Sequence, residues 1–213
     1  MTEQEICKHL DGKLEEFLLK FDEVLRNKLK EKLYFAGGCI YSLANSQEPR
    51  DYDLFMTDLS LMNELVNLDI WKFVSDYALS VGKFQIVHKY YGEPSYCVGQ
   101  FDFLHNMHYY IPFSNKIRNA YTEEDEEKEF EDFEYLRTNE LIFNEKRARD
   151  IEGVFLRIEK FVSRGFKISK QTIKNIKSRT TRKSVRQYKK QRCSGGNRRC
   201  NSWGKYEKFK RVK

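Results

Sequence analysis

The feature that most constrains the fold is a pair of glycines followed, after a short turn, by two aspartates. Residues 33–36 are apolar and predict the end of a β-strand. Gly37 and Gly38 come next, and because neither has a Cβ their backbone amides can approach a phosphate closely. Asp51 and Asp53 stand two apart in the next predicted strand, so both carboxylates lie on one face of the sheet. Two such carboxylates repel each other unless a cation lies between them, and oxygen ligands of this kind suit Mg²⁺ or Mn²⁺.

The Gly-Gly pair, twelve intervening residues (39–50) and Asp-hydrophobic-Asp-hydrophobic resemble the signature of the DNA polymerase β-type nucleotidyltransferase superfamily. Within it, residues 36–40 and 50–55 are most similar to the head domain of poly(A) polymerases and CCA-adding tRNA nucleotidyltransferases. The resemblance covers roughly residues 30–168. It implies transfer of a nucleoside monophosphate from a nucleoside triphosphate to a hydroxyl group. The alternative is an ordinary strand-turn-strand, since Asp-rich turns often only hydrogen-bond their own backbone.

The resemblance also implies which residues hold the nucleotide. Gly37, Gly38, Ser42 and Arg50 are expected to bind its phosphates. Tyr41 and Ser42 stand where CCA-adding enzymes normally have an Arg-Asp pair, which weakens the case for CCA addition in particular.

A third acidic residue is expected downstream. Phe84–Tyr91 and Tyr96–Leu104 are rich in β-branched and aromatic residues and predict a hairpin. Asp102 lies in the second strand between two phenylalanines, so it points away from the face that they bury. The resemblance implies that Asp102 joins Asp51 and Asp53 in holding two Mg²⁺ or Mn²⁺ ions about 3.5–4 Å apart, and helps to deprotonate the attacking hydroxyl. The alternative is an exposed aspartate on a sheet edge.

Helices are predicted on both sides of this region by apolar residues at a 3.6-residue period. Residues 5–30 predict one amphipathic helix that covers the sheet, residues 59–79 predict one or two helices, and residues 136–168 are expected to be helical. Residues 137–139 are weakly similar to the Arg-Arg-Asp-Phe-Thr-x-Asn segment of the family.

The end of the last predicted helix resembles the Leu-Arg-x-x-Arg-Phe-x-x-x-x-Gly-Phe neck motif of poly(A) and CCA-adding enzymes. Arg157 matches its first Arg, and Lys160 takes the place of its second. Two cations three residues apart share a helix face and could clamp a triphosphate, although Lys lacks the bidentate geometry of Arg. An exposed basic face that ends at Gly165 as C-cap is the alternative.

The net charge of +7 is divided unevenly. Residues 167–213 hold 18 Lys and Arg against one Glu, which is +17, so residues 1–166 carry 7 − 17 = −10. Such a basic segment interleaved with aromatic residues favours phosphate contacts and base stacking, although a solubilising tail is the alternative. The residues expected to bind nucleic acid are Arg182, Lys183, Arg186, Lys189, Lys190 and Arg192.

The remaining bulk properties point to a cytoplasmic protein. No apolar run approaches the roughly 20 residues of a membrane-spanning helix, and the acidic start does not suit a signal peptide. Five scattered cysteines fit reduced thiols better than a disulfide framework.

These observations predict an α+β nucleotidyltransferase palm, a mixed or antiparallel sheet with helices on one face, followed by a helical neck and a basic extension. The expected domains are 1–134 (head), 135–168 (neck) and 169–213 (nucleic-acid-binding tail). The expected function is template-independent transfer from an NTP, ATP or CTP, to an RNA 3′ end such as that of a tRNA. Two alternatives stay open: a small nucleotidyltransferase that modifies a protein or small molecule, and a catalytically idle palm that binds RNA.

Overall fold

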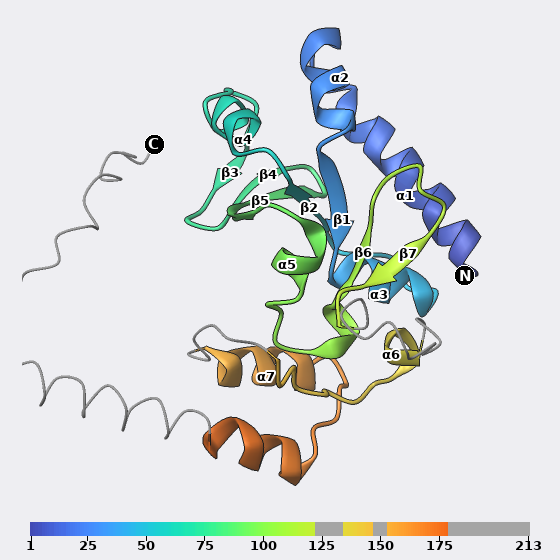
Figure 1. Cartoon of the computed structure of the whole chain (residues 1–213), viewed down its shortest axis with the longest axis vertical. Coiled ribbons are helices and arrows are strands. Elements are labelled where there is room, and N and C mark those ends of the chain that lie inside the picture. Colours follow the sequence, from blue (N-terminus) through green and yellow to red (C-terminus); the bar gives the residue numbers. More distant parts are fainter. Residues whose placement is uncertain (122–133, 147–152, 179–213) are drawn as a thin grey trace, which may run out of the picture.

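The computed structural model describes residues 1–121, 134–146 and 153–178, which form an α+β fold as predicted (Figure 1). Residues 170–178 are also helical. The named elements, in chain order, are α1 (Glu3–Leu18), α2 (Glu23–Lys30), β1 (Leu33–Ala36), α3 (Gly38–Ala44), β2 (Tyr52–Met56), α4 (Leu59–Val66), β3 (Phe73–Val74), β4 (Ala78–Val81), β5 (Phe84–Tyr91), α5 (Pro94–Val98), the 3₁₀ helix η1 (Leu104–Asn106), β6 (His108–Tyr110), β7 (Ile117–Asn119), α6 (Glu134–Arg137) and α7 (Val154–Val162).

One mixed sheet of seven strands organises the molecule, in the order β3-β4-β5-β2-β1-β6-β7. Strands β2 and β5 are parallel, and the other neighbouring pairs are antiparallel. The strand that carries the Asp-x-Asp pattern, β2, therefore lies inside the sheet between β1 and β5. Its backbone is hydrogen-bonded on both sides, which fixes the position of the aspartates.

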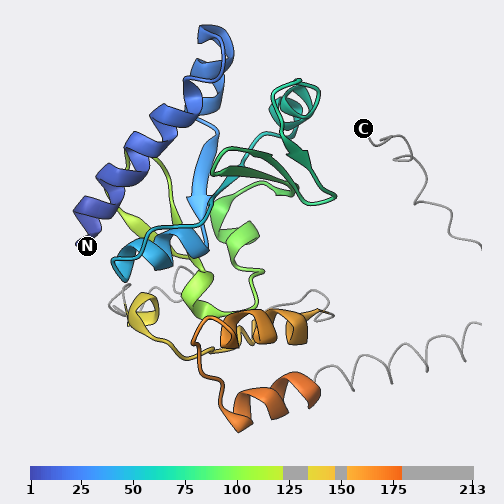
Figure 2. The ribbon, with the colours of Figure 1, turned by 180° about the vertical axis from the view of Figure 1, so that it is seen from behind.

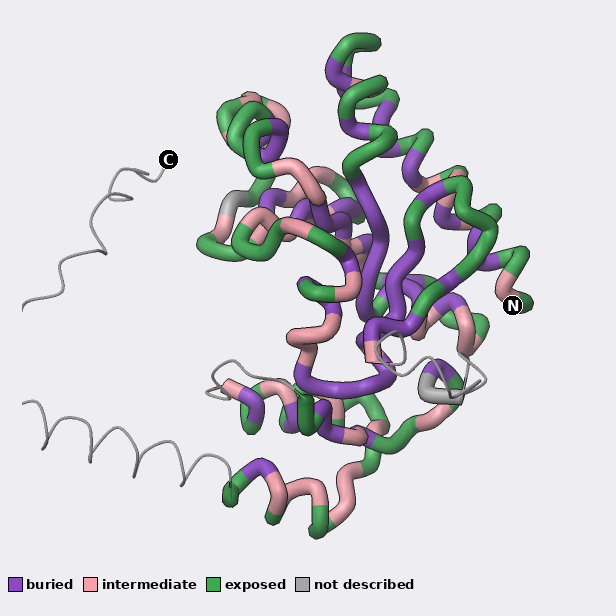
Figure 3. Tube along the Cα trace, viewed as in Figure 1, coloured by how far each residue is buried: buried purple, intermediate pink, exposed green. Residues whose placement is uncertain are grey.

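The sheet buries apolar side chains on both faces, because successive side chains of a strand point to opposite sides. Phe35 of β1 and Leu54 of β2 lie in the larger core, together with helices α1 to α4. Tyr34 and Phe55 lie in a second core on the opposite face, with Val98 of α5. Figure 2 shows α1 running along the helix-covered side, and Figure 3 shows that β1 is buried along its length.

The predicted N-terminal helix is two helices. α1 begins with a capping box between Thr2 and Glu5, and it ends at Leu18. Asp22 then accepts a hydrogen bond from the Leu25 amide (2.9 Å) and caps α2. The break was predictable from Asp22, whose side chain competes with a helical backbone.

The predicted hairpin between Phe84–Tyr91 and Tyr96–Leu104 is wrong in its second strand. β5 forms as predicted, but its antiparallel partner is β4. β3 and the start of β4 fall within residues 59–79, which had been expected to be helical. Helix α5 stands where the second strand was expected. Pro94 occupies the first turn of α5, where its fixed φ and missing amide favour a helix start.

The neck is also less helical than predicted. α7 begins only at Val154, after Gly153 with φ +79°, and α6 has four residues. The chain between α6 and α7 includes an extended segment in which Leu141 and Phe143 are buried. Phe143 forms a β-bridge with Phe103. Their helical spacing therefore reflects contacts with the head rather than a continuous helix.

An aromatic cluster joins the neck to the head. The ring of His105, in η1, lies 4.9 Å from that of Phe161 in α7 and 4.6 Å from that of Phe166. Tyr41 of α3 packs on Phe166 from the head side, and its hydroxyl donates to the Thr138 carbonyl (3.1 Å). These contacts tie the neck to α3, the helix that begins at Gly38.

Cys7, Cys39 and Cys97 are free, buried thiols. No helix in the described ranges is both long and apolar enough to span a bilayer.

Candidate functional site

The glycine pair makes the turn from β1 into α3. Gly37 has φ +80°, a conformation that side-chain-bearing residues rarely adopt. Its amide donates to the His108 carbonyl (3.1 Å), and a Cβ on it would lie 3.4 Å from the Phe101 ring. Gly38 opens α3, and within the described residues nothing lies within 4 Å of the position that its Cβ would take. The turn therefore presents bare backbone, which is the property that phosphate binding needs.

Strand β2 brings the two aspartates together on the face opposite the larger core. Leu54 points into that core and Phe55 into the second one, so Asp53 lies on the same side as Phe55. The Asp51 carboxylate, just before the strand, accepts a hydrogen bond of 3.4 Å from Gln85 of β5, which pairs with Asp53 in the sheet. The two predicted carboxylates thus share one face.

The pKa of Asp53 depends on the charges of two other groups. Burial and, to a lesser degree, the charge of Asp51 raise the pKa of Asp53 to about 7, although the charge of Lys160 acts to lower it. Lys160 lies in the last turn of α7. The charges of Asp51 in the head and Lys160 in the neck thus both act on the Asp53 carboxyl.

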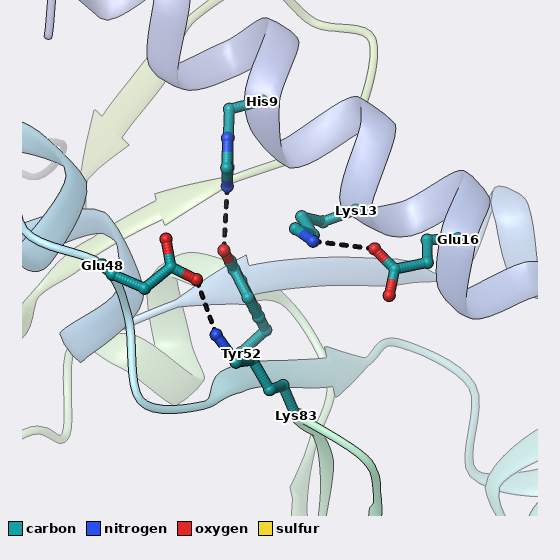
Figure 4. Close-up of polar contacts among 6 residues, drawn as sticks. All are labelled: His9, Lys13, Glu16, Glu48, Tyr52 and Lys83. Atoms are coloured by element: carbon teal, nitrogen blue, oxygen red, sulfur yellow. Dashed lines mark hydrogen bonds and ion pairs between the residues drawn. The ribbon is translucent and has the colours of Figure 1, made fainter.

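Contacts behind β2 fix the strand in place (Figure 4). The buried Tyr52, between the two aspartates, forms a hydrogen bond through its hydroxyl with Nε2 of His9 in α1 (2.8 Å). Burial raises the pKa of Tyr52 to about 12. Lys83, next to β5, forms an ion pair with Glu48 in the loop before the aspartates (2.7 Å). The aspartates are therefore held from the helix-covered side.

Asp102 is not on a strand. It lies in a bend between α5 and η1, is buried, and forms an ion pair with Arg157 of α7. Asn144 fixes the bend, because its amide donates to the Asp102 carbonyl (2.8 Å). The strand that was expected to carry Asp102 into the site is absent, so its carboxylate meets the neck instead.

The three predicted carboxylates do not form one cluster. Within the described residues, no group of three or more His, Cys, Asp and Glu side chains could hold a metal ion. The structure brings together Asp51 and Asp53 and leaves Asp102 with Arg157.

For the remaining predicted residues, the structure shows the location of Ser42 and Arg50. Ser42 is half-buried in α3, and its carbonyl accepts from the Asn45 and Gln47 amides (3.1 and 2.8 Å). Arg50 is exposed beside Asp51. Arg182, Lys183, Arg186, Lys189, Lys190 and Arg192 lie outside the described residues.

Sequence reasoning missed the structural role of the segment that starts at Asp102. Asp102, Phe103 and Asn106 have the Asp-Phe-x-x-Asn spacing of the Arg-Arg-Asp-Phe-Thr-x-Asn segment, which fits better than residues 137–139. In the structure Phe103 and His105 pack on Phe161 of α7. That spacing was the signal that could have identified the head-to-neck contact.

Comparisons with known proteins bear on both family and fold. A family model described as Gad2, Gabija anti-defense 2 family protein, matches residues 10–131, which is more than half of the 213-residue chain. No curated protein matches the chain.

Solved structures of nucleotidyltransferases resemble the fold at low sequence identity. A CCA-adding enzyme in complex with CTP is 14% identical over 82% of this chain and 47% of its own, with a TM-score of 0.50. A tRNA-processing enzyme in an apo form is 15% identical over 79% of this chain and 47% of its own, also with a TM-score of 0.50. A Thermotoga maritima CCA-adding enzyme complexed with tRNA is 16% identical over 78% of this chain and 44% of its own, with a TM-score of 0.49. This chain spans less than half the length of each, and the first two likenesses show a nucleotidyltransferase-type fold.

Proposed function

The chain belongs to the Gabija anti-defense 2 family, and from that premise we propose that it counters Gabija defence as a nucleotidyltransferase. It would move a nucleoside monophosphate from an NTP to an acceptor hydroxyl and release pyrophosphate. The observation that carries this proposal is that Asp51 and Asp53 lie on one face of β2, where the charge of Lys160 also acts on Asp53.

The donor set of Asp51 and Asp53 fits a divalent cation. The mutual repulsion and burial that raise the pKa of Asp53 are relieved when a cation lies between the two carboxylates. Mg²⁺ is commonly bound by one or two carboxylates together with substrate phosphates and water. When bound, Mg²⁺ or Mn²⁺ would neutralise phosphate charge and lower the pKa of a hydroxyl bound to it.

The protein residues would bind and orient the triphosphate. The Gly38 amide suits its phosphate oxygens, whereas Gly37, whose amide donates to the His108 carbonyl, would contribute the turn and the space that a missing Cβ leaves. Ser42 and Arg50 are further candidates. Lys160 approaches the same site from the neck and would add positive charge. Arg157 would not contact the triphosphate but would position α7 through its ion pair with Asp102.

An RNA end is the first candidate acceptor, with ATP or CTP as the donor nucleotide. The supporting observations are the fold, which is like that of a CCA-adding enzyme, and the charge of +17 on residues 167–213. In this proposal residues 1–134 form the head, 135–168 the neck and 169–213 the RNA-binding extension, and the reaction takes place in the cytoplasm.

A protein acceptor is the second candidate, and the family description favours it. A protein that acts against a defence system must meet a component of that system or one of its ligands. Transfer to a hydroxyl of a defence protein would use the same carboxylates and would not need residues 169–213.

The test is transfer of label by the purified full-length chain. It is incubated with Mg²⁺ and each α-³²P-labelled NTP in turn, together with RNA pools, tRNA or purified Gabija proteins. The control is Asp51→Asn/Asp53→Asn, which keeps side-chain size and removes the charges. Label in RNA or protein that depends on the aspartates would establish the reaction and the acceptor. If no acceptor is labelled under any of these conditions, the proposal is wrong and the palm acts by binding alone.

A further inference from the structure

A cavity of about 370 Å³ lies beside the candidate site and is lined by residues to which the function proposed above gives no role. Its walls come from α5, from the segment after it, from the end of β7 and from the loop that precedes α7. The side chains that matter chemically are Ser95, Tyr96, Gln100, Tyr121 and Lys146. The volume is within the range of about 300–1,000 Å³ that is typical of small-molecule pockets.

Hydrogen bonds hold the walls of this cavity in place. The buried Asn144 donates through Nδ2 to the carbonyls of Gly99 (2.8 Å) and Phe101 (3.0 Å), which flank Gln100. Its Oδ1 accepts from the Lys146 amide (3.0 Å), so the same residue fixes the loop that carries Lys146. The cavity is therefore formed by ordered backbone, which is what a preorganised ligand site needs.

The opposite wall is fixed in a similar way. The Tyr121 amide donates to Oδ1 of the buried Asn119 at the end of β7 (2.9 Å). The Lys146 ammonium donates to the Tyr121 carbonyl (3.2 Å) and lies 4.7 Å from the centre of its ring. A cation and an aromatic ring are thereby placed together at the rim.

The lining groups match the chemistry of a nucleotide. Tyr96 and Tyr121 offer two aromatic rings from separate segments, and stacking on an aromatic ring suits any base. The Gln100 Oε1 atom is buried and has no hydrogen-bond partner in the described part of the chain. A buried acceptor of this kind is costly unless a donor reaches it, and a ring or exocyclic N–H of a base would do so once the Gln100 amide turns into the cavity that it lines. Lys146 supplies the positive charge that a phosphate needs.

The cavity shares a wall with the candidate catalytic site. Phe101, which follows Gln100, has its ring beside Gly37. The next residue, Asp102, forms the ion pair with Arg157 of α7. One short segment thus has the cavity on one side and the glycine turn and neck on the other.

We propose that this cavity binds a single nucleotide unit, with its base between Tyr96, Tyr121 and Gln100 and its phosphate at Lys146. The further assignment of this unit as the terminal nucleotide of an acceptor strand rests on the proposed function. Binding by itself does not depend on that function, so the two can fail separately.

Binding is tested with mononucleotides, which are too short to bridge to the basic extension. The full-length Asp51→Asn/Asp53→Asn protein is titrated in EDTA with AMP, CMP, GMP, UMP, adenosine and ribose 5-phosphate, by calorimetry and saturation-transfer NMR. At least one nucleotide should bind at least fivefold more tightly than ribose 5-phosphate. Lys146→Ala should weaken nucleotide binding at least fivefold and leave nucleoside binding unchanged, whereas Tyr121→Leu and Gln100→Leu should weaken both.

Matched controls are Tyr91→Leu and Lys116→Ala, which replace exposed residues outside the cavity lining, and each variant's melting temperature is measured first. Gln100→Leu keeps the test valid if Tyr121→Leu does not fold. Equal binding of ribose 5-phosphate and the nucleotides, or equal binding by wild type and the cavity variants, would overturn the proposal.

The acceptor assignment has its own arm in the transfer assay. Gln100→Leu should raise the KM for the RNA acceptor at least fivefold and leave the KM for the NTP unchanged. An unchanged KM for RNA would overturn the acceptor assignment. If no transfer occurs but mononucleotides bind in the cavity, the proposed function fails and the nucleotide site remains.

Discussion

Among single residues, Asp53 is the one on which the proposed metal site most depends. Its surroundings disfavour the charged form of its carboxyl. Burial and the neighbouring Asp51 raise its pKa to about 7. A cation reverses this penalty, so the same feature that destabilises the empty site favours metal binding. The sequence was sufficient to predict this pair, because alternation along a strand is local information.

Substituting Asp53 by Asn should therefore stabilise the protein above neutral pH. A carboxyl whose folded pKa is raised contributes stability below its unfolded pKa near 4, and this contribution is lost as the pH rises through 7. The free energy of unfolding of Asp53→Asn, minus that of wild type, should rise by about 3–4 kcal/mol between pH 4 and pH 8. Urea titrations in EDTA measure it. A difference that stays constant with pH would show that Asp53 titrates normally.

His105 has the opposite pH dependence. Burial, together with His108, lowers its pKa to about 3, and neither of its ring nitrogens has a hydrogen-bond partner among the described residues. The unfolded chain takes up a proton near pH 6.5, whereas the folded chain does not until about pH 3. The contribution of His105 to stability is thus lost as the pH falls from about 6.5 towards 3.

His105→Phe, which keeps the packing with Phe161 and Phe166, should remove this loss. Relative to wild type, the variant should gain about 2 kcal/mol in free energy of unfolding between pH 7.5 and pH 4.5. Urea titrations at the two pH values test this, with His88→Phe, on the half-buried strand β5, as the control. A variant that follows wild type at both values would contradict the assigned environment.

At the level of elements, α7 connects the neck to the head through one ion pair and one apolar face. Arg157 pairs with the buried Asp102, while Val154 and Ile158 pack in the core beside Phe103. Lys160, one turn further on, is exposed and acts on Asp53 through its charge. Two cations of α7 therefore have different roles: Arg157 positions the helix, and Lys160 acts on the Asp53 carboxyl.

Arg157→Ala and Lys160→Ala should consequently differ. Arg157→Ala leaves a buried carboxylate without its ion pair and should lower the free energy of unfolding by about 1–3 kcal/mol, since Arg157 is itself partly exposed. Lys160→Ala should change it by less than about 0.5 kcal/mol and should raise the pKa of Asp53 further. Thermal unfolding and NMR titration of Asp53 distinguish the two. Equal destabilisation by both substitutions would contradict the separation.

The elements also show where sequence information ends. The β1-turn-β2 unit was predictable because Gly37, Gly38 and the alternation around Asp53 are local signals. The predictions of a second hairpin strand and of a long neck helix were wrong. Short apolar runs such as 96–104 fit both the two-residue period of a strand and the 3.6-residue period of a helix. Their outcome depends on tertiary contacts, such as the bridge between Phe103 and Phe143, which local spacing does not specify.

At the scale of the whole molecule, this member of the Gabija anti-defense 2 family has a nucleotidyltransferase-type fold. The chain matches less than half the length of the CCA-adding enzyme that it resembles. The carboxylate pair, the glycine turn and the neck cation lie within its described part, whereas the predicted RNA-binding residues lie outside it. Three carboxylates were expected from the sequence, and the structure places Asp51 and Asp53 on one face of β2 and pairs Asp102 with Arg157.

The proposed metal site on Asp51 and Asp53 is tested most directly by measuring Mn²⁺ binding by electron paramagnetic resonance, in the presence of a non-hydrolysable NTP analogue. Wild type, Asp53→Asn and Asp102→Asn are compared, after circular dichroism has shown that each is folded. We predict that Asp53→Asn weakens Mn²⁺ binding at least tenfold and that Asp102→Asn changes it less than twofold. Equal loss in both variants, or no binding by wild type, would contradict a metal site built on Asp51 and Asp53.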